Sequence, residues 1–212
     1  MESNEKFVRY IAIIALLIAV VGVSVGFAAL TNTVNIKAGA EVRYPNPDSV
    51  AVLSTDDDSS QQGTVTPTTT GGATGDNASL GTDTIQNMKA HFTAPGQSVT
   101  YSFYAYNGSS FISYLNSVVF GAKTCTPAQT NGGTQSYVTA ACADISMSIT
   151  AGTGAGAATF TTDNTNVTGH SVAAGGSEPI VVTITYATGG AVADGDFDVD
   201  FGTTVLTYST VD

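Results

Sequence analysis

Four aspartates at alternate positions form the most conspicuous group of candidate ligands in the sequence. In the stretch ADGDFDVDFG they alternate with Phe197, Val199 and Phe201, so on a strand the four would share one face. They are Asp194, Asp196, Asp198 and Asp200. Closely spaced carboxylates are what Ca²⁺ binds, although the Gly and Glu of an EF-hand loop do not follow in register. The alternative, which we favour, is a solvent-facing strand whose charges prevent edge-to-edge pairing.

Two further groups have residue types that could do chemistry. Asp56, Asp57 and Asp58 form a charge run in a predicted loop, and the same solvated alternative applies to them. The stretch GHSVA at 169–173 resembles a nucleophile elbow, but that motif needs an apolar strand before it and a helix after it. We therefore expect it to be a loop with no catalytic partner.

The only histidines are His91 and His170, and neither has a Cys or a second His at metal-binding spacing. The sequence thus predicts no enzyme active site. It predicts no cofactor other than the Ca²⁺ alternative at the aspartate row.

Three tyrosines offer a candidate binding face. Tyr104, Tyr106 and Tyr114 could stack against sugar rings, which would make the protein a binding module. Cross-strand aromatic pairs that hold a Thr-rich sheet together are the more common use of such residues, and we place that interpretation first.

The two cysteines predict one disulfide. Cys125 and Cys142 enclose sixteen residues rich in Gly, Thr and Gln, and in an exported protein such a pair is oxidised. Closing a loop of that size is worth about 3 kcal/mol by the chain-entropy estimate. A metal site fails on ligand count, because no histidine lies near either cysteine in the sequence.

Short strands separated by turn residues must position these side chains. Alternation of apolar and polar residues predicts strands, and no soluble amphipathic helix is evident. The pair Asn107-Gly108 predicts a hairpin between two of the strands. The segment 54–83, rich in Thr, Gly and Ser, is expected to be a long loop with short edge strands around 64–70. The predicted strands lie at 51–53, 88–92, 99–107, 111–120, 145–150, 158–162, 179–187, 196–201 and 205–210.

This pattern predicts an all-β fold: an antiparallel β-sandwich of about seven to nine strands, Ig-like or jelly-roll-like. It would form a single domain over residues 29–212, preceded by an N-terminal hydrophobic helix. The net charge of −11, from 17 acidic against 6 basic residues, argues against nucleic-acid binding and against adhesion to anionic lipids. It favours solubility outside the cell.

The N-terminal segment predicts export. Ile11 to Ala29 is uncharged and would span about 28 Å as a helix, close to the thickness of a bilayer core. Its bulky residues give way to small ones at the far end, which is typical of a signal peptide over 1–28, although a retained membrane anchor has the same apolar helix. A strand with period-two alternation follows, and its apolar positions are Leu30, Val34, Ile36, Ala38, Ala40 and Val42.

Two stretches resemble the TasA/camelysin-like secreted surface proteins of Gram-positive bacteria. One is the junction GFAALTNTVNI, and the other is FTAPGQSVTYSFYAYNGSSFISYLNSVVF at 92–120. The resemblance implies cleavage between Ala28 and Ala29 and a freed N-terminal strand that completes the sheet of the next subunit. Some camelysin relatives are metallopeptidases, an activity for which this sequence shows no zinc-ligand arrangement.

Together these observations predict an exported bacterial cell-surface or extracellular-matrix structural protein that polymerises by N-terminal strand donation. Its partners would be further copies of itself or other cell-surface proteins. The first alternative is a membrane-anchored ectodomain that binds a glycan or a protein, and the second is a camelysin-like metallopeptidase.

Overall fold

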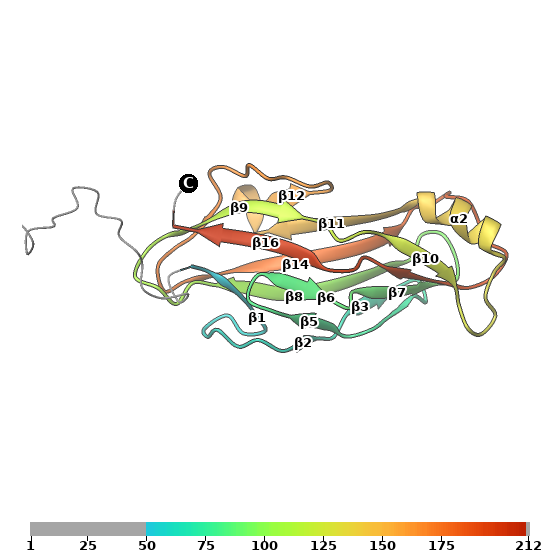
Figure 1. The fold of residues 1–212 in the computed structure, drawn as a ribbon, viewed down its shortest axis with the longest axis horizontal. Coiled ribbons are helices and arrows are strands. Elements are labelled where there is room, and N and C mark those ends of the chain that lie inside the picture. Colours follow the sequence, from blue (N-terminus) through green and yellow to red (C-terminus); the bar gives the residue numbers. More distant parts are fainter. Residues whose placement is uncertain (1–49, 211–212) are drawn as a thin grey trace, which may run out of the picture. The chain divides into compact units, whose positions relative to one another are not determined.

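The computed structural model describes residues 50–210, and these form a mostly-β structure with three antiparallel sheets (Figure 1). The N-terminal hydrophobic segment, the cleavage position at Ala28 and Ala29, and the predicted donor strand at 30–42 lie outside the described residues. The predicted fold class holds at this level. The predicted sandwich of seven to nine strands does not match the count, since sixteen strands are present within 50–210.

Sheet 1 contains the longest strands and is built around β14. Its order is β1-β8-β14-β11-β12, and β3 also pairs with β8. Because β14 lies between β8 and β11, both of its edges are hydrogen-bonded, and its even-numbered residues from Ile180 to Tyr186 are buried. The strands are β1 (Val52–Ser54), β3 (Thr68–Thr70), β8 (Ser98–Tyr106), β11 (Ile145–Ala151), β12 (Ala158–Phe160) and β14 (Ser177–Tyr186).

Sheets 2 and 3 are assembled from shorter strands. Sheet 2 has the order β10-β15-β7-β4, from β4 (Thr74–Gly75), β7 (Lys89–Phe92), β10 (Thr124–Pro127) and β15 (Phe197–Asp200). Sheet 3 has the order β13-β9-β16-β6-β5-β2. Its strands are β2 (Thr64–Val65), β5 (Ala78–Leu80), β6 (Thr84–Gln86), β9 (Ser113–Val119), β13 (Ser171–Val172) and β16 (Thr204–Ser209).

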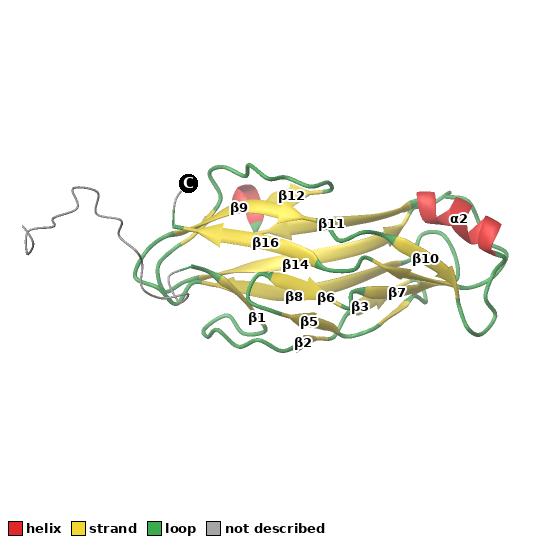
Figure 2. Ribbon diagram, viewed as in Figure 1, coloured by secondary structure: helices red, strands yellow, loops and turns green. Residues whose placement is uncertain are grey.

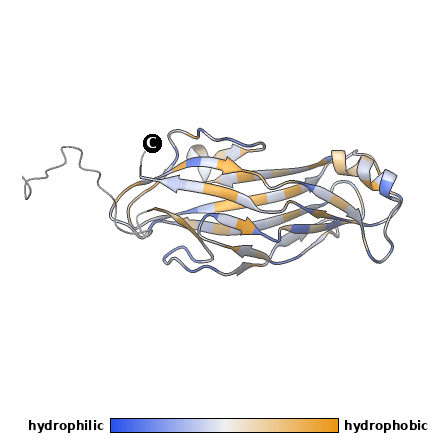
Figure 3. Ribbon diagram, in the orientation of Figure 1, coloured by the Kyte–Doolittle hydropathy of each residue, from blue (hydrophilic) through white to orange (hydrophobic). Residues whose placement is uncertain are grey.

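The core forms where the inward faces of these strands meet. Phe92 of β7, Tyr186 of β14 and Phe197 of β15 pack edge to face or tilted, with ring centroids 5.4–6.0 Å apart, and so join sheets 1 and 2. Each aromatic pair of this geometry contributes about 0.5–1.5 kcal/mol of stability beyond the contribution of the apolar area that it buries. Hydrophobic and hydrophilic positions alternate along the long strands (Figure 3), which is why the period-two pattern located them correctly.

The predicted loop at 54–83 contains four short strands, β2 to β5, two of them in the expected region around 64–70. The Thr-rich strand β3 pairs with one end of β8, while β1 pairs with the other end. Strands of two or three residues are too short to show a detectable alternation of apolar and polar residues. The sequence therefore predicts a loop for most of this segment.

The hairpin predicted at Asn107-Gly108 is wrong, because β8 belongs to sheet 1 and β9 to sheet 3. Asn107 is fully buried, and its side-chain amide donates to the carbonyl oxygens of Phe111, Val172 and Ala173 at 2.7–3.1 Å. It therefore anchors a crossing between sheets. Neither residue of the pair is among those with positive φ that a two-residue hairpin of this type requires.

The segment between the cysteines contains a helix that the sequence did not reveal, α2 (Gln135–Ala143), which lies beside β10 (Figure 2). Its buried residues are Val138 and Ala141. The Gly-rich stretch after β11 forms a hairpin to β12 and contains the short 3₁₀ helix η2 (Gly154–Gly156).

Candidate functional site

The predicted disulfide is present and ties the helix to the end of sheet 2. Cys125 on β10 is bonded to Cys142 on α2, with Cα atoms 6.0 Å apart. Lys123 donates from Nζ to the carbonyl oxygens of Cys142 and Ile145, both at 2.7 Å, and burial lowers the pKa of this amine. The cross-link and the lysine thus hold the C-terminal end of α2 against the strands on either side of it in the chain.

The four aspartates of the predicted row do not act together. Asp194 accepts a hydrogen bond from the backbone N–H of Thr134 at 2.6 Å, just before α2. Hydrogen bonding with the Thr134 side chain, and to a smaller extent with its backbone, lowers the pKa of the Asp194 carboxyl group. A carboxylate at a helix N-terminus also interacts favourably with the helix dipole. Only Asp198 and Asp200 belong to β15 itself.

The remaining aspartates of the row face the basic side chains of His91 and Lys89 across the sheet. His91 on β7 lies between two carboxylates: its Nδ1 is 2.8 Å from Asp198 and its Nε2 is 3.8 Å from Asp196. Lys89 is 3.7 Å from Asp200. Because β15 is paired on both sides, by β10 and β7, its charges do not protect a sheet edge, and that part of the prediction is wrong.

Lys89, His91, Asp198 and Asp200 line an open groove of about 460 Å³ on the outer face of sheet 2. The register places them in two rows across the strands. The first row is Thr126, Asp198, His91 and Thr74, and the second is Thr124, Asp200 and Lys89. Every one of these side chains is polar. The groove is therefore a hydrogen-bonding surface made from segments more than a hundred residues apart.

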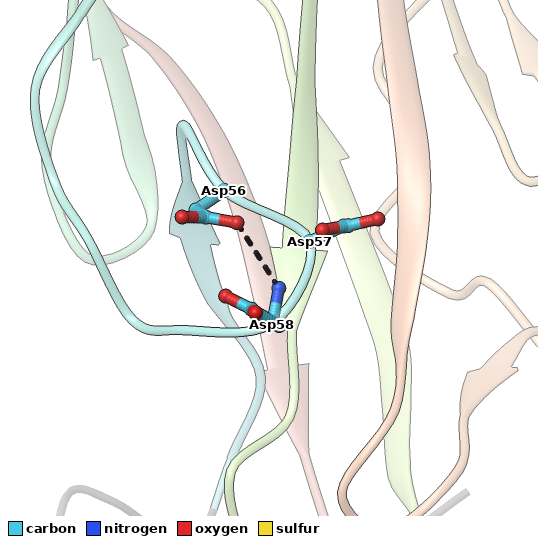
Figure 4. A group of neighbouring side chains, drawn as sticks. All are labelled: Asp56, Asp57 and Asp58. Atoms are coloured by element: carbon cyan, nitrogen blue, oxygen red, sulfur yellow. Dashed lines mark hydrogen bonds between the residues drawn. The ribbon is translucent and has the colours of Figure 1, made fainter.

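Asp56, Asp57 and Asp58 form the one group in residues 50–210 whose potential metal-ligating atoms all lie within 4.8 Å of one another (Figure 4). Asp56 accepts the backbone N–H of Asp58 at 3.3 Å, which lowers its pKa, whereas the adjacent Asp56 side chain raises the pKa of Asp58. The loop is shaped by the buried Ser54 hydroxyl, which bonds three neighbouring backbone groups within 3.0 Å. The run lies in a loop, as the sequence predicts, and Asp57 and Asp58 are exposed.

The three candidate tyrosines are divided between two sheets. Tyr104 and Tyr106 lie on β8 in sheet 1, next to Pro179 and Ser177 of β14. Tyr114 lies on β9 in sheet 3, paired with Ser171 and Ser209. None of the residues paired with these tyrosines in the strand registers is aromatic, so the aromatic cross-strand pairing expected from the sequence does not occur in these registers.

A buried polar network is the feature that the sequence interpretation missed. The sequence predicts His170 to be a loop residue with no catalytic partner. In the structure, the Nε2 atom of His170 lies 2.6 Å from Oε2 of Glu178. Tyr208 donates its hydroxyl to Glu178 Oε1 at 2.9 Å. The His170 and Glu178 side chains are 11% and 10% exposed, and Tyr208 is 7% exposed. The carboxylate of Glu178 thus has a partner on each oxygen, as a buried charge requires.

The network joins three parts of the fold. Glu178 occupies an inward-facing position of β14, Tyr208 an inward-facing position of β16, and His170 immediately precedes β13. It therefore links sheets 1 and 3 through their interior. Ser171, the serine of the elbow-like stretch, is exposed and pairs with Tyr114 in the sheet ladder. The arrangement is that of a structural connection.

The buried phenol of Tyr208 gives a prediction for alkaline solution. Burial, reinforced by the Glu178 carboxylate, raises the pKa of Tyr208 well above its usual value. A raised pKa in the folded state means that its contribution to stability is complete below about pH 10 and is lost as the pH rises towards the folded-state pKa. We expect the free energy of unfolding to fall less steeply between about pH 10 and 11.5 in Tyr208→Phe than in the wild type.

Urea unfolding across this pH range measures the slope. Tyr137→Phe is the matched control, because Tyr137 is 56% exposed and its removal should leave the slope unchanged. A Tyr208→Phe slope equal to that of the wild type would show that another group governs alkaline unfolding.

The described part of the chain is thus a mostly-β protein whose sheets are joined by a disulfide-linked helix and by a buried carboxylate network. No protein-family model matches the chain, and a search of the curated proteins finds no match either. Among residues 50–210, no helix has the length and apolar character needed to cross a membrane.

Proposed function

We propose that this chain is an exported bacterial cell-surface or extracellular-matrix structural protein that assembles by donation of its N-terminal strand. The disulfide supports an extracellular or otherwise oxidising compartment, because cytosolic thiols are kept reduced. The acidic composition and the signal-peptide-like segment support export.

One observation carries the assembly part of the proposal: sheet 1 has a partly open edge. Strand β11 pairs with β14 along all seven of its residues, but on its other side it pairs with β12 only over Ile149–Ala151. Residues 145–148 have no strand partner on that side among the described residues. An incoming strand could extend the sheet there by β-augmentation.

The position of Lys123 fits this proposal. Its ammonium group donates a hydrogen bond to the backbone carbonyl oxygen of Ile145, which lies on the same stretch of β11. Lysine at an exposed strand edge is a common device against unwanted pairing. In this chain it would delay assembly until a strand of the correct pattern competes for the edge.

Deleting Ala29 to Val42 tests the proposal. We expect the deletion to abolish self-assembly, followed by light scattering and electron microscopy, while the remaining domain stays soluble and monomeric. The reason is that the donated strand is removed and the accepting edge is left intact.

A pair of substitution variants provides the matched control. Val34→Ser with Ile36→Ser removes apolar positions of the donor pattern and should slow assembly strongly, whereas Thr33→Ser with Asn35→Ser changes the opposite face and should not. Unchanged fibres in the deletion variant would refute strand donation.

A further inference from the structure

We propose that the groove on the outer face of sheet 2 binds a neutral oligosaccharide. This function is separate from strand donation, because the groove uses β4, β7, β10 and β15 and does not involve the open edge of β11. The site also differs from the tyrosines considered from the sequence, none of which lines it.

The chemistry of the lining groups favours a polyhydroxylated ligand. Neighbouring strands are about 4.8 Å apart, so each row presents polar groups at that interval. Carboxylates accept hydrogen bonds, the Lys89 ammonium donates them, and threonine hydroxyls do both. A sugar hydroxyl also does both, and therefore a saccharide can satisfy groups of either kind along a row. Binding here would depend on hydrogen bonds, because no tryptophan, tyrosine or phenylalanine lines the groove for stacking.

The charges of the groove argue against anionic ligands. Asp76, Asp198 and Asp200 line it, against one lysine. Phosphate groups and acidic sugars would be repelled by this balance.

The pairing of the same groups argues against a bare metal ion. Asp196 and Asp198 lie at different nitrogens of His91, and Asp200 faces Lys89. The carboxylates therefore do not converge on one point. Among the described residues, three convergent ligands occur only in the Asp56–Asp58 loop.

The groove is held rigid from below, which reduces the entropy cost of binding. The Tyr101 hydroxyl, rising from the core, donates to the carbonyl oxygens of Lys89 and Asp76 at 2.8 and 2.9 Å. Burial raises the pKa of this phenol, so it remains a donor at ordinary pH. On the adjoining strand, a Cβ atom at Gly75 would lie 2.7 Å from Val99, so only glycine allows β4 to approach the core this closely.

The test compares the wild type with Thr74→Val plus Thr126→Val on an array of neutral and acidic oligosaccharides. Both threonines are exposed, and valine keeps their volume and strand preference while removing the two hydroxyls at the ends of the first row. We expect the wild type to retain at least one neutral glycan and no acidic one. We expect the double variant to bind that glycan about tenfold more weakly, as measured by titration calorimetry.

Thr185→Val with Thr207→Val is the matched control, since it removes two strand hydroxyls from sheets 1 and 3 and should leave the affinity unchanged. Thermal unfolding confirms that each variant is folded. The proposal is overturned if no neutral glycan is retained, if acidic glycans are retained preferentially, or if both double variants lose affinity equally. If the groove does not bind glycans, the result of the fibre assay on the deletion variant is unaffected. The two proposals are therefore tested independently.

Discussion

Replacing His170 with alanine is expected to lower the free energy of unfolding by about 3 kcal/mol. The substitution removes the partner that lies 2.6 Å from Glu178 and leaves a carboxylate that is only 10% exposed with Tyr208 alone. A buried charge that loses a partner costs far more than the pair contributed, because water cannot replace the lost bond. Urea unfolding at neutral pH, with the midpoint and slope fitted together, measures the change.

His91→Ala is the matched control. His91 also pairs with carboxylates, but its side chain is 30% exposed and that of Asp198 is 47% exposed, so water can solvate the group left behind. We expect a loss below about 1 kcal/mol. Equal losses for the two histidine variants would contradict the argument from burial.

A double-mutant cycle separates the charge from the packing. In a Glu178→Gln background the group left buried is a neutral amide, so the further loss on His170→Ala should be clearly smaller than in the wild type. Strictly additive losses would mean that the two side chains contribute through shape alone.

The long strands could be predicted from the sequence because their burial is regular. In β14 the residues Ile180, Val182, Ile184 and Tyr186 are buried and alternate with half-buried neighbours. The amino-acid sequence of the strand shows the same period of two. The same pattern contains a further signal. Glu178 occupies the next inward position of that alternation, and a charged residue on the core face of a strand requires a buried partner.

The partners themselves could not be read from the sequence. Tyr208 is 30 positions from Glu178, and Asp198 is 107 positions from His91. Such contacts depend on which strands become neighbours, and short, similar Thr-rich strands leave several pairings open. The wrong prediction of a hairpin at Asn107-Gly108 has the same origin. The local preference of this residue pair for a tight turn is outweighed by the burial of the Asn107 side-chain amide between two sheets.

The helix α2 was missed because its own sequence is a weak helix signal. TQSYVTAACAD contains β-branched residues and no side-chain cap, and only Val138 and Ala141 are buried. A nine-residue helix of this kind is marginal in isolation. Its stability must therefore come from tertiary constraints, of which the bond from Cys142 to Cys125 is the strongest.

Replacing both cysteines with serine is accordingly expected to lower the free energy of unfolding by about 3 kcal/mol, because the unfolded chain regains the freedom of a loop closed across a separation of 17 residues. The measurement is urea unfolding of the wild type with and without a dithiol reductant, which reduces the bond to two thiols. The wild type should lose stability on reduction, and the serine variant should not respond to the reductant.

Loss of the disulfide should destabilise the helix α2 more than the rest of the fold. Besides the disulfide, α2 has at its C-terminal end the Lys123 bond to the Cys142 carbonyl, and at its N-terminal end the Asp194 bond to Thr134. Both contacts are exposed, so water competes for the same groups and they are too weak to hold a marginal helix. Amide hydrogen exchange should therefore show lost protection over 135–143 in the serine variant while β14 stays protected. Uniform loss across both segments would mean that the disulfide stabilises the whole fold without a particular role for α2.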